Sequence, residues 1–422
     1  MPHYDLLGIG IGPANLSLAA LADPLPDLRA TFVDTRPDFR WHPGLMLSSS
    51  QLTVTFFRDL VSLVDPTNQF SFINFLVTEG RAFRFLEAQG LTPSRREFEQ
   101  YYQWVTARLN SLRWSKRVES VSLEEDGFRV TYTGGASDTA RDVVLGSGAE
   151  PRMPGFAKPY AGGLVIHSSE TTRILPHQWK GRRVLVVGAG QSGGEVVSHL
   201  LGDESFLPAH LTWTSSSTGF QPLDDSPFTN EWFSANFVNF FHQLPDTRRT
   251  EILREQRAAG GDGITDTLIR SVYQRLYHLD YVLESDMQHR LLPGRRAVGI
   301  RRNDSSHVVD LHDLNLGTVE PVPADLVIFC TGYDSRLPDY LKPLQNRISF
   351  RNDKPEVNAD YSLTIGGPSE GRLFVQGFAE SSHGLNDTLL SLAAWRSARI
   401  INASTGRDIY RVEPGTSTIT WE

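Results

Sequence analysis

The chain has 422 residues, of which 40% are hydrophobic and 21% charged, and its formal net charge is −8. This length exceeds one ordinary hydrophobic core and predicts two or three domains. The acidic balance argues against nucleic acid as the main partner. No apolar run approaches the roughly 18 residues of a membrane span. No signal peptide is expected either, and a cytoplasmic enzyme is the natural interpretation.

Cys330 is the only cysteine in the sequence. A disulfide framework, a cysteine-based zinc cluster and a redox-active dithiol are therefore excluded within one chain. We expect no metal site, and we expect Cys330 to be a buried thiol.

A first glycine-rich turn follows the short apolar strand expected at Tyr4–Leu7. Its sequence is Gly8-Ile9-Gly10-Ile11-Gly12-Pro13, and a helix-like stretch follows. Gly8, Gly10 and Gly12 would let the backbone approach a pyrophosphate held at the helix N-terminus. Pro13 is interpreted as the third small position of the motif, and Asp34 as the acid that binds a ribose hydroxyl. The alternative is a turn that only packs a helix on a sheet.

A second turn of the same kind follows the strand expected at Arg183–Val187. Its candidate nucleotide-binding residues are Gly188, Gly190, Gln191, Ser192 and Gly193. Two such turns in one chain predict two nucleotide cofactors that meet, and hence electron transfer.

The order of the expected elements predicts an α/β fold with two Rossmann-like dinucleotide-binding domains and a small helical substrate lobe. We expect the first domain at 1–165 and 325–422, the second at 166–220 and 290–324, and the lobe at 221–289. A helix is predicted from Ser94 to Leu112, with Ser94 and Glu97 as a capping box. Strands are predicted near 117–147, and another at 325–330 before a glycine turn.

Segments spread over nearly the whole chain together resemble the flavin-dependent N-hydroxylating monooxygenases of siderophore biosynthesis, above all the bacterial lysine N6-hydroxylases. The segments are Trp41-His42-Pro43-Gly44, Phe57-Arg58-Asp59-Leu60-Val61, Asp65-Pro66-Thr67-Asn68, Gly188–Gly193, Asp262-Gly263-Ile264-Thr265, Thr331-Gly332-Tyr333, His383-Gly384-Leu385 and Leu392–Ile400.

The resemblance implies FAD on the first unit, NADPH on the second and O2 as co-substrate. It implies hydroxylation of a terminal primary amine by a flavin C4a-hydroperoxide, which the protein must keep dry. L-lysine is the favoured substrate, and ornithine, putrescine, cadaverine and histamine remain open. Relatives of this kind are often tetramers, so a homo-oligomer is expected.

The resemblance also implies roles for individual residues. Besides the first glycine turn and Asp34, the residues expected to contact FAD are Trp41, His42, Thr53, Thr331, Gly332, Asn386 and Leu390. Family members commonly have Met-Gln where this chain has Leu52-Thr53, which alters the wall beside the flavin. Trp41 has an ordinary core aromatic as its alternative role.

The residues expected to contact the substrate are Arg58, Asn230, Asp262, His383 and Leu385. Arg58 lies where amino-acid hydroxylases place a lysine on the substrate carboxylate, and a guanidinium can do the same work. The alternatives are an Arg58–Asp59 ion pair, a loop-capping Asn230, Asp262 as the N-cap of a helix at Ile264–Tyr273, and a structural His383.

The nicotinamide specificity is open because Ser215, Ser216 and Ser217 stand where NADPH-preferring relatives have arginines. Serines can hydrogen-bond a 2′-phosphate but bring no charge, so NADPH is the first choice and NADH stays possible.

Rival functions fit the sequence less well. A disulfide reductase would need a second cysteine beside Cys330. A Baeyer–Villiger monooxygenase would need its full signature, of which Gly163 and His167 supply only the middle, with Ala161 and Thr171 at the ends. A flavin-binding regulator without turnover is the third alternative.

Overall fold

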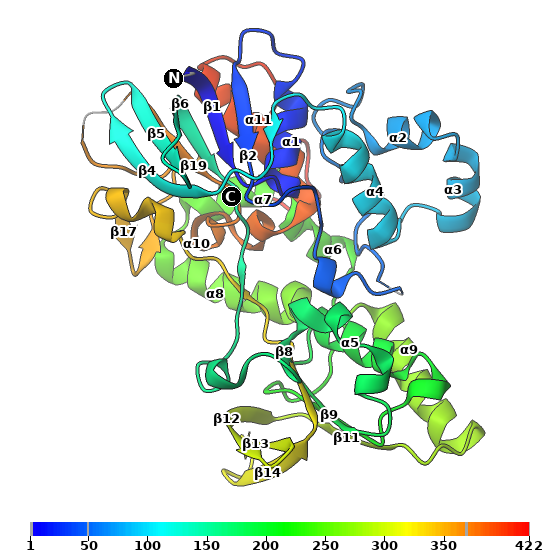
Figure 1. Cartoon of the computed structure of the whole chain (residues 1–422). Coiled ribbons are helices and arrows are strands. Elements are labelled where there is room, and N and C mark those ends of the chain that lie inside the picture. The colour runs from blue at the N-terminus through cyan, green and yellow to red at the C-terminus, as the bar shows by residue number, and fades with distance from the viewer. Residues whose placement is uncertain (1–2, 49, 368–369, 422) are drawn as a thin grey trace.

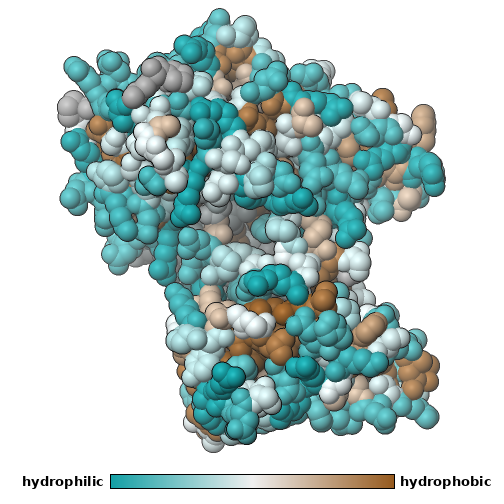
Figure 2. All heavy atoms as spheres, viewed as in Figure 1, coloured by the Kyte–Doolittle hydropathy of each residue, from teal (hydrophilic) through white to brown (hydrophobic). Residues whose placement is uncertain are grey.

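The computed structural model describes residues 3–48, 50–367 and 370–421. They form two bodies joined by a narrower waist (Figure 1). The face seen in Figure 2 is mainly hydrophilic, with a hydrophobic area on the lower body. The upper body in Figure 1 holds the first glycine turn, and the lower body holds the second. Among these residues, no helix has the length and apolar character that a membrane crossing needs.

The upper body is built on a sheet of order β3-β2-β1-β6-β5-β4, to which β19 adds beside β6. The strands β1, β2, β3, β6 and β19 are parallel, and β4–β5–β6 form an antiparallel meander. The bounds are β1 His3–Ile9, β2 Ala30–Val33, β3 Leu112–Arg113, β4 Val118–Glu124, β5 Gly127–Tyr132, β6 Ser137–Leu145 and β19 Leu373–Val375. The strands predicted near 117–147 are thereby confirmed.

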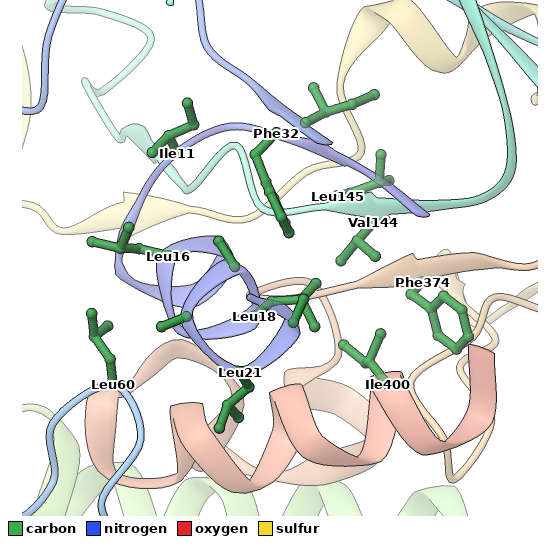
Figure 3. Packing of buried hydrophobic residues seen from close by; sticks show 14 of the residues in the cluster. Ile11, Leu16, Leu18, Leu21, Phe32, Leu60, Val144, Leu145, Phe374 and Ile400 are labelled. Carbon is green, nitrogen blue, oxygen red and sulfur yellow. The ribbon is translucent and has the colours of Figure 1, made fainter. Parts of the chain in front are cut away.

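The helix α1 (Pro13–Ala22) packs on this sheet, and α11 (Ala393–Thr405) packs on α1. Almost every residue of α1 is buried, as expected for a helix that is hydrophobic all round. Figure 3 shows α1 between the sheet and α11, with Leu21 directed toward α11 and Ile400 rising from α11 toward Phe374. The C-terminal segment therefore returns to the first domain, as predicted.

Three further helices flank the first sheet: α2 (Phe72–Thr78), α3 (Ala82–Gln89) and α4 (Arg95–Thr106). The predicted helix at 94–112 is confirmed in its start, where the Ser94 hydroxyl accepts a hydrogen bond from the Glu97 amide. It ends at Thr106, because the following residues lead into the edge strand β3.

The lower body has a parallel sheet of order β11-β10-β9-β15-β8. Its elements are β8 Val165–His167, β9 Arg183–Val187, α5 Gln191–Leu201, β10 His210–Thr214, β11 Gln288–Leu292 and β15 Leu326–Phe329. The predicted boundary at residue 325 is wrong for β15, since this strand pairs with β8 and β9. All four of its residues are buried, which requires a neighbour on each side and cover on both faces.

An antiparallel sheet of β12 (Arg295–Asn303), β13 (Ser306–Asp313) and β14 (Val319–Ala324) covers one face of the lower sheet. Its inward side chains, such as Val309 and Leu311, share a core with Leu185 and Val187 of β9.

The region 221–289 is helical as predicted, but it is not a separate lobe. Its elements are α6 Pro227–Asn230, α7 Ala235–Gln243, α8 Asp246–Gln256, a π-helical turn Arg257–Gly261, α9 Asp266–Tyr277 and a second π-helical turn His278–Val282. Val238 of α7 belongs to the core of the upper body, whereas Val272 and Leu276 of α9 belong to that of the lower body. A small cluster of its own, with Phe237, Phe241 and Ile252, joins α7 to α8.

The remaining elements are short. They are β7 Glu150–Pro151, β16 Tyr333–Asp334, β17 Phe350–Arg351, β18 Lys354–Pro355, α10 Glu380–His383, and the 3-10 helices Pro43–Leu45, Lys158–Tyr160, Ser168–Arg173, Pro176–Gln178, Glu204–Phe206, Glu231–Phe233, Asp339–Leu344, Leu385–Thr388 and Leu390–Leu392.

Candidate functional site

The first glycine turn has the geometry of an anion site. Gly10 follows β1 with φ +93°, and a Cβ there would lie 2.5 Å from the Gly146 carbonyl oxygen. Gly12 is the N-cap of α1, and no side chain caps this helix. A Cβ on Gly12 would meet only the Gly146 oxygen, at 3.7 Å, so the approach to the helix end is open. An open, uncapped helix N-terminus suits a pyrophosphate.

The third position of the first motif is Asn15, and its assignment to Pro13 is wrong. Gly12 and Gly190 are the N-caps of α1 and α5, so Pro13 matches Gln191 and Asn15 matches Gly193. Gly8 lies within β1, packed on the Phe32 ring. The Asn15 side chain donates to the carbonyl oxygen of Gly10 at 2.8 Å and thus fixes the turn.

Asp34 follows β2, beside the turn, as expected. Its carboxylate accepts hydrogen bonds from the Ile11 amide at 2.8 Å and from the Arg36 guanidinium at 2.8 and 3.0 Å. Burial raises the pKa of Asp34, but the Arg36 and Ile11 hydrogen bonds outweigh it and hold the pKa below its usual value. Asp34 is thus an ionised acceptor whose ribose contact remains a prediction.

The second glycine turn repeats this design. Gly188 has φ +121°, and Gly193 lies so close to the Gly188 oxygen that a Cβ would be 2.1 Å from it. Gly190 caps α5 without a capping side chain. Ser192 is partly buried in the first turn of α5. The Gln191 side chain turns away, because it donates to Glu195 and accepts from the Thr265 amide.

Gln191 belongs to a polar connection between the two bodies. Arg95, at the start of α4, donates to both carboxylate oxygens of Glu195 in α5, at 2.7 and 2.9 Å. The exposed fractions of the two side chains are 18% and 3%. Burial raises the pKa of Glu195, and Arg95 opposes that shift. Sequence reasoning missed this pair, since its members are 100 residues apart.

The serine turn, Ser215–Ser217, follows β10 directly. In dinucleotide-binding folds, this place faces the ribose of the nucleotide. Ser215 is buried, and its hydroxyl accepts from the Ser217 amide at 3.1 Å. Ser216 is exposed. The segment that precedes β12 runs alongside this turn, which the sequence did not reveal.

Trp41 and His42 lie between α4, through Tyr102, and the segment that carries Tyr333. Trp41 is buried against Tyr102, edge to face at 5.3 Å, so its alternative role as a core aromatic agrees with the structure. His42 has a left-handed backbone (φ +46°), and its ring meets Tyr333 edge-on at 6.2 Å. The residue keeps contact with solvent, although protein atoms surround its ring closely. Desolvation by the surrounding protein, together with the charges of Arg95 and Arg36, lowers the pKa of His42 to about 4.

Thr331 and Gly332 lie at the crossover between the bodies. The Thr331 hydroxyl donates to the Arg152 carbonyl, and the Gly332 carbonyl accepts from His167 at 3.0 Å. Cys330 is buried, and burial raises the pKa of its thiol to about 12, as fits an inert thiol. Thr53 is exposed, and Leu390 packs partly buried on the upper core.

Arg58 is partly buried and has no acidic partner among the described residues. The alternative Arg58–Asp59 ion pair is wrong, because the Asp59 carboxylate accepts from the amides of Val61, Ser62 and Phe72 at 2.7 to 3.0 Å. Burial lowers the pKa of the Arg58 guanidinium, with no carboxylate to offset it. An unpaired cation in this position is available to an anionic ligand.

Three segments expected to contact the substrate meet at the waist. A Cβ on Gly260 would lie 3.7 Å from Thr229, and one on Gly261 would lie 3.2 Å from Leu385. The Asn386 side chain donates to the Trp232 carbonyl at 2.8 Å. The loops that carry Asn230, Asp262 and Leu385 are thereby brought together.

Within this group, Asn230 is exposed and donates to the Asp225 carbonyl at 2.7 Å, which agrees with its loop-capping alternative. Asp262 is 67% exposed and 4.0 Å from Arg257. It is not the N-cap of α9, because that position belongs to Thr265.

His383 is buried in this structure, and its expected substrate contact remains a prediction. The ring is 1% exposed, stacks on Tyr361 at 4.1 Å and lies 4.9 Å from His242. Burial and His242 lower the pKa of His383 well below its usual value. Its Nδ1 atom lies 2.8 Å from the Ser382 hydroxyl, and its Nε2 atom is buried without a hydrogen-bond partner among the described residues.

A buried polar network, also missed from the sequence, joins the first turn to the C-terminal loop. Arg396 contacts the Asp387 carboxylate at 3.5 Å and donates to Gln376, whose amide donates to Asn15 at 2.9 Å. Asp387 in turn accepts from the Gly377 and Ala379 amides. The network fixes the loop that carries Asn386 relative to the Gly10 turn.

Comparison with known proteins shows the family of the chain. The model of the L-lysine 6-monooxygenase/L-ornithine 5-monooxygenase family matches residues 2–335. The chain is 35% identical over 420 residues to the L-lysine N6-monooxygenase of Escherichia coli, with 99% of this chain and 98% of the relative covered. It is 31% identical to the putrescine N-hydroxylase of Shewanella oneidensis, with 97% and 82% covered.

Two solved structures are similar over nearly the full length. The FAD-bound cadaverine monooxygenase of Erwinia amylovora superimposes with a TM-score of 0.93 at 32% identity, covering 100% of this chain and 98% of that one. The ornithine N-hydroxylase of a Kutzneria species, with reduced FAD, NADP+ and L-ornithine, gives a TM-score of 0.89 at 27% identity, covering 96% and 99%.

Proposed function

The chain belongs to the L-lysine 6-monooxygenase/L-ornithine 5-monooxygenase family, and from that premise we propose that it hydroxylates the terminal amine of a small primary amine that also carries a carboxylate, with L-lysine as the first candidate. It is a flavin-dependent N-hydroxylating monooxygenase of siderophore biosynthesis. The choice among lysine, ornithine and the diamines depends on how the two ends of the substrate are held.

We place FAD at the first glycine turn and NADPH at the second. The N-termini of α1 and α5, which no side chain caps, support this, since amides in the first turn of a helix attract a pyrophosphate. FAD reduced by NADPH supplies the oxygen-transfer chemistry. Asp34 would face the ribose of FAD, and Asn386, with a buried side-chain oxygen that has no partner among the described residues, would face the flavin side of the site.

The choice among the candidate substrates depends on the unpaired guanidinium of Arg58. A guanidinium that is partly desolvated and unpaired costs stability, and a substrate carboxylate would relieve that cost with a charge-assisted hydrogen bond. Lysine and cadaverine differ only in that carboxylate, so they separate the two substrate classes. Asn230 and Asp262, on the converging loops, would then meet the α-amino group of an amino acid.

The test is hydroxylamine formation from lysine, ornithine, cadaverine, putrescine and histamine, with wild type and Arg58→Met. Loss of one charge-assisted hydrogen bond, about 1.5–3 kcal/mol, should raise the KM for lysine roughly 10- to 150-fold. The KM for cadaverine should stay nearly constant. Arg96→Met, an exposed arginine of α4, is the matched control.

A wild-type enzyme that prefers cadaverine to lysine would refute the amino-acid substrate in favour of a diamine. An unchanged lysine KM in Arg58→Met would remove Arg58 from carboxylate binding. We further propose that the enzyme acts in the cytoplasm. We also propose that it is a homo-oligomer, and light scattering of the purified protein can check its oligomeric state.

A further inference from the structure

The serine turn after β10 is in contact with a segment that lies about 80 residues later in the chain. The Ser217 carbonyl accepts a hydrogen bond from the Gly294 amide at 2.7 Å, and the Ser215 carbonyl accepts one from the Arg295 amide at 2.8 Å. The Thr214 hydroxyl donates to the Leu292 carbonyl at 3.0 Å. Two consecutive arginines, Arg295 and Arg296, therefore begin β12 directly beside the serine turn.

The serine turn occupies a defined place in the second dinucleotide unit. It follows β10, the strand next to β9, just as Asp34 follows β2 beside β1. In dinucleotide-binding folds this place faces the adenosine ribose, and an arginine nearby accommodates a 2′-phosphate. The serines alone bring no charge, and the Ser215 hydroxyl is already engaged by the Ser217 amide.

The two arginines differ in their surroundings. The Arg295 guanidinium pairs with the buried Asp313 carboxylate at 2.8 Å. Asp313 also accepts from the Asn315 and Leu316 amides, so this pair is built into the turn that leads to β14. Arg296 is exposed and has no acidic partner among the residues the structure describes. Successive side chains of a strand point to opposite faces, so Arg296 does not share the Asp313 contact.

We propose that Arg296 supplies the positive charge that recognises the 2′-phosphate of NADPH at the Ser215–Ser217 turn. Arg295, held by Asp313, fixes the backbone from which Arg296 extends, and the exposed Ser216 hydroxyl is a second donor. A guanidinium suits a phosphate because its planar fork makes charge-assisted hydrogen bonds. The inference rests on the proposed placement of NADPH at the second glycine turn.

Binding of nucleotide fragments tests this without turnover. Calorimetry on the FAD-loaded enzyme would compare 2′,5′-ADP, which carries the 2′-phosphate, with 5′-AMP, which lacks it. Arg296→Met should weaken 2′,5′-ADP binding at least about tenfold, equal to about 1.4 kcal/mol, and leave 5′-AMP binding unchanged. The ratio of kcat/KM for NADPH to that for NADH should fall by a similar factor. Arg302→Met, an exposed arginine farther along β12, is the control and should change neither ligand.

Wild-type-like 2′,5′-ADP binding by Arg296→Met would overturn the inference, and so would an equal loss of 5′-AMP binding. Failure of the proposed function is distinguishable from both results. An enzyme that hydroxylates lysine but binds 2′,5′-ADP independently of Arg296 refutes only the role of Arg296. An enzyme that binds 2′,5′-ADP through Arg296 but forms no hydroxylamine refutes only the proposed reaction.

Discussion

Replacing Arg95 by methionine should slow the reduction of the flavin by NADPH. Arg95 and Glu195 connect the two bodies, and Glu195 also accepts from Gln191 at 3.0 Å, directly after the Gly190 cap. Gln191 in turn accepts from the Thr265 amide at the start of α9. Loss of Arg95 would therefore loosen the second glycine turn relative to the upper body, where hydride transfer has to occur.

The expected loss of stability in Arg95→Met follows from the burial of Glu195. Its side chain is 3% exposed, so Arg95→Met leaves a buried carboxylate without its cation. Breaking such a pair from one side costs about 3–5 kcal/mol of stability. Burial already raises the pKa of Glu195, and loss of Arg95 raises it further. A raised carboxyl pKa favours the folded state at low pH, so the deficit of the variant should be largest at alkaline pH and shrink as Glu195 takes up a proton.

The assay is anaerobic stopped-flow reduction, with thermal unfolding measured in parallel. Arg95→Met should lower both the midpoint temperature of unfolding and the rate of flavin reduction. The double variant Arg95→Met/Glu195→Gln should recover part of both losses, because it removes the unpaired carboxylate. The control is Arg183→Met, which breaks the Arg183–Asp325 pair inside the lower body. It should cost stability but leave the reduction rate unchanged. If Arg95→Met destabilises the enzyme yet reduces flavin at the wild-type rate, the pair is only structural and the reasoning fails.

Two further predictions concern buried side chains. Gln256 is fully buried, and neither of its amide atoms has a partner among the described residues. Gln256→Met should therefore raise the free energy of unfolding, by up to about 1–3 kcal/mol in chemical denaturation, and a clear loss of stability would show that the amide is satisfied. Burial raises the pKa of the Cys330 thiol to about 12, so iodoacetamide should label it near neutral pH only after unfolding. Rapid labelling of the folded enzyme would contradict this placement.

Local patterns predicted much of the fold. The two glycine turns, the strands on either side of them and the α4 N-cap depend on residues close in the sequence, and the structure has them. The first motif begins at Gly10 and not at Gly8, because Gly8 belongs to β1, and the predicted third position at Pro13 is therefore wrong. Alignment of the two motifs on their helix N-caps, Gly12 and Gly190, gives Asn15 as the third position of the first motif.

Contacts between residues far apart in the chain could not be predicted from the sequence. The apolar run of β15 shows that it is buried, but not that it pairs with β8 and β9. His383 carries the same local pattern whether it faces a ligand or packs on Tyr361. The unpaired state of Arg58 likewise depends on Asp59 being engaged by distant amides such as that of Phe72. Such features require the tertiary structure.

The central claim is tested most directly by measuring the hydroxylamine product of L-lysine with the FAD-loaded enzyme, NADPH and oxygen. Product detection matters, because NADPH is also consumed when reduced flavin releases peroxide without hydroxylation. The account predicts N6-hydroxylysine in amounts that approach the NADPH consumed. NADPH oxidation that yields only hydrogen peroxide, with lysine and with every other primary amine of the panel, would contradict it.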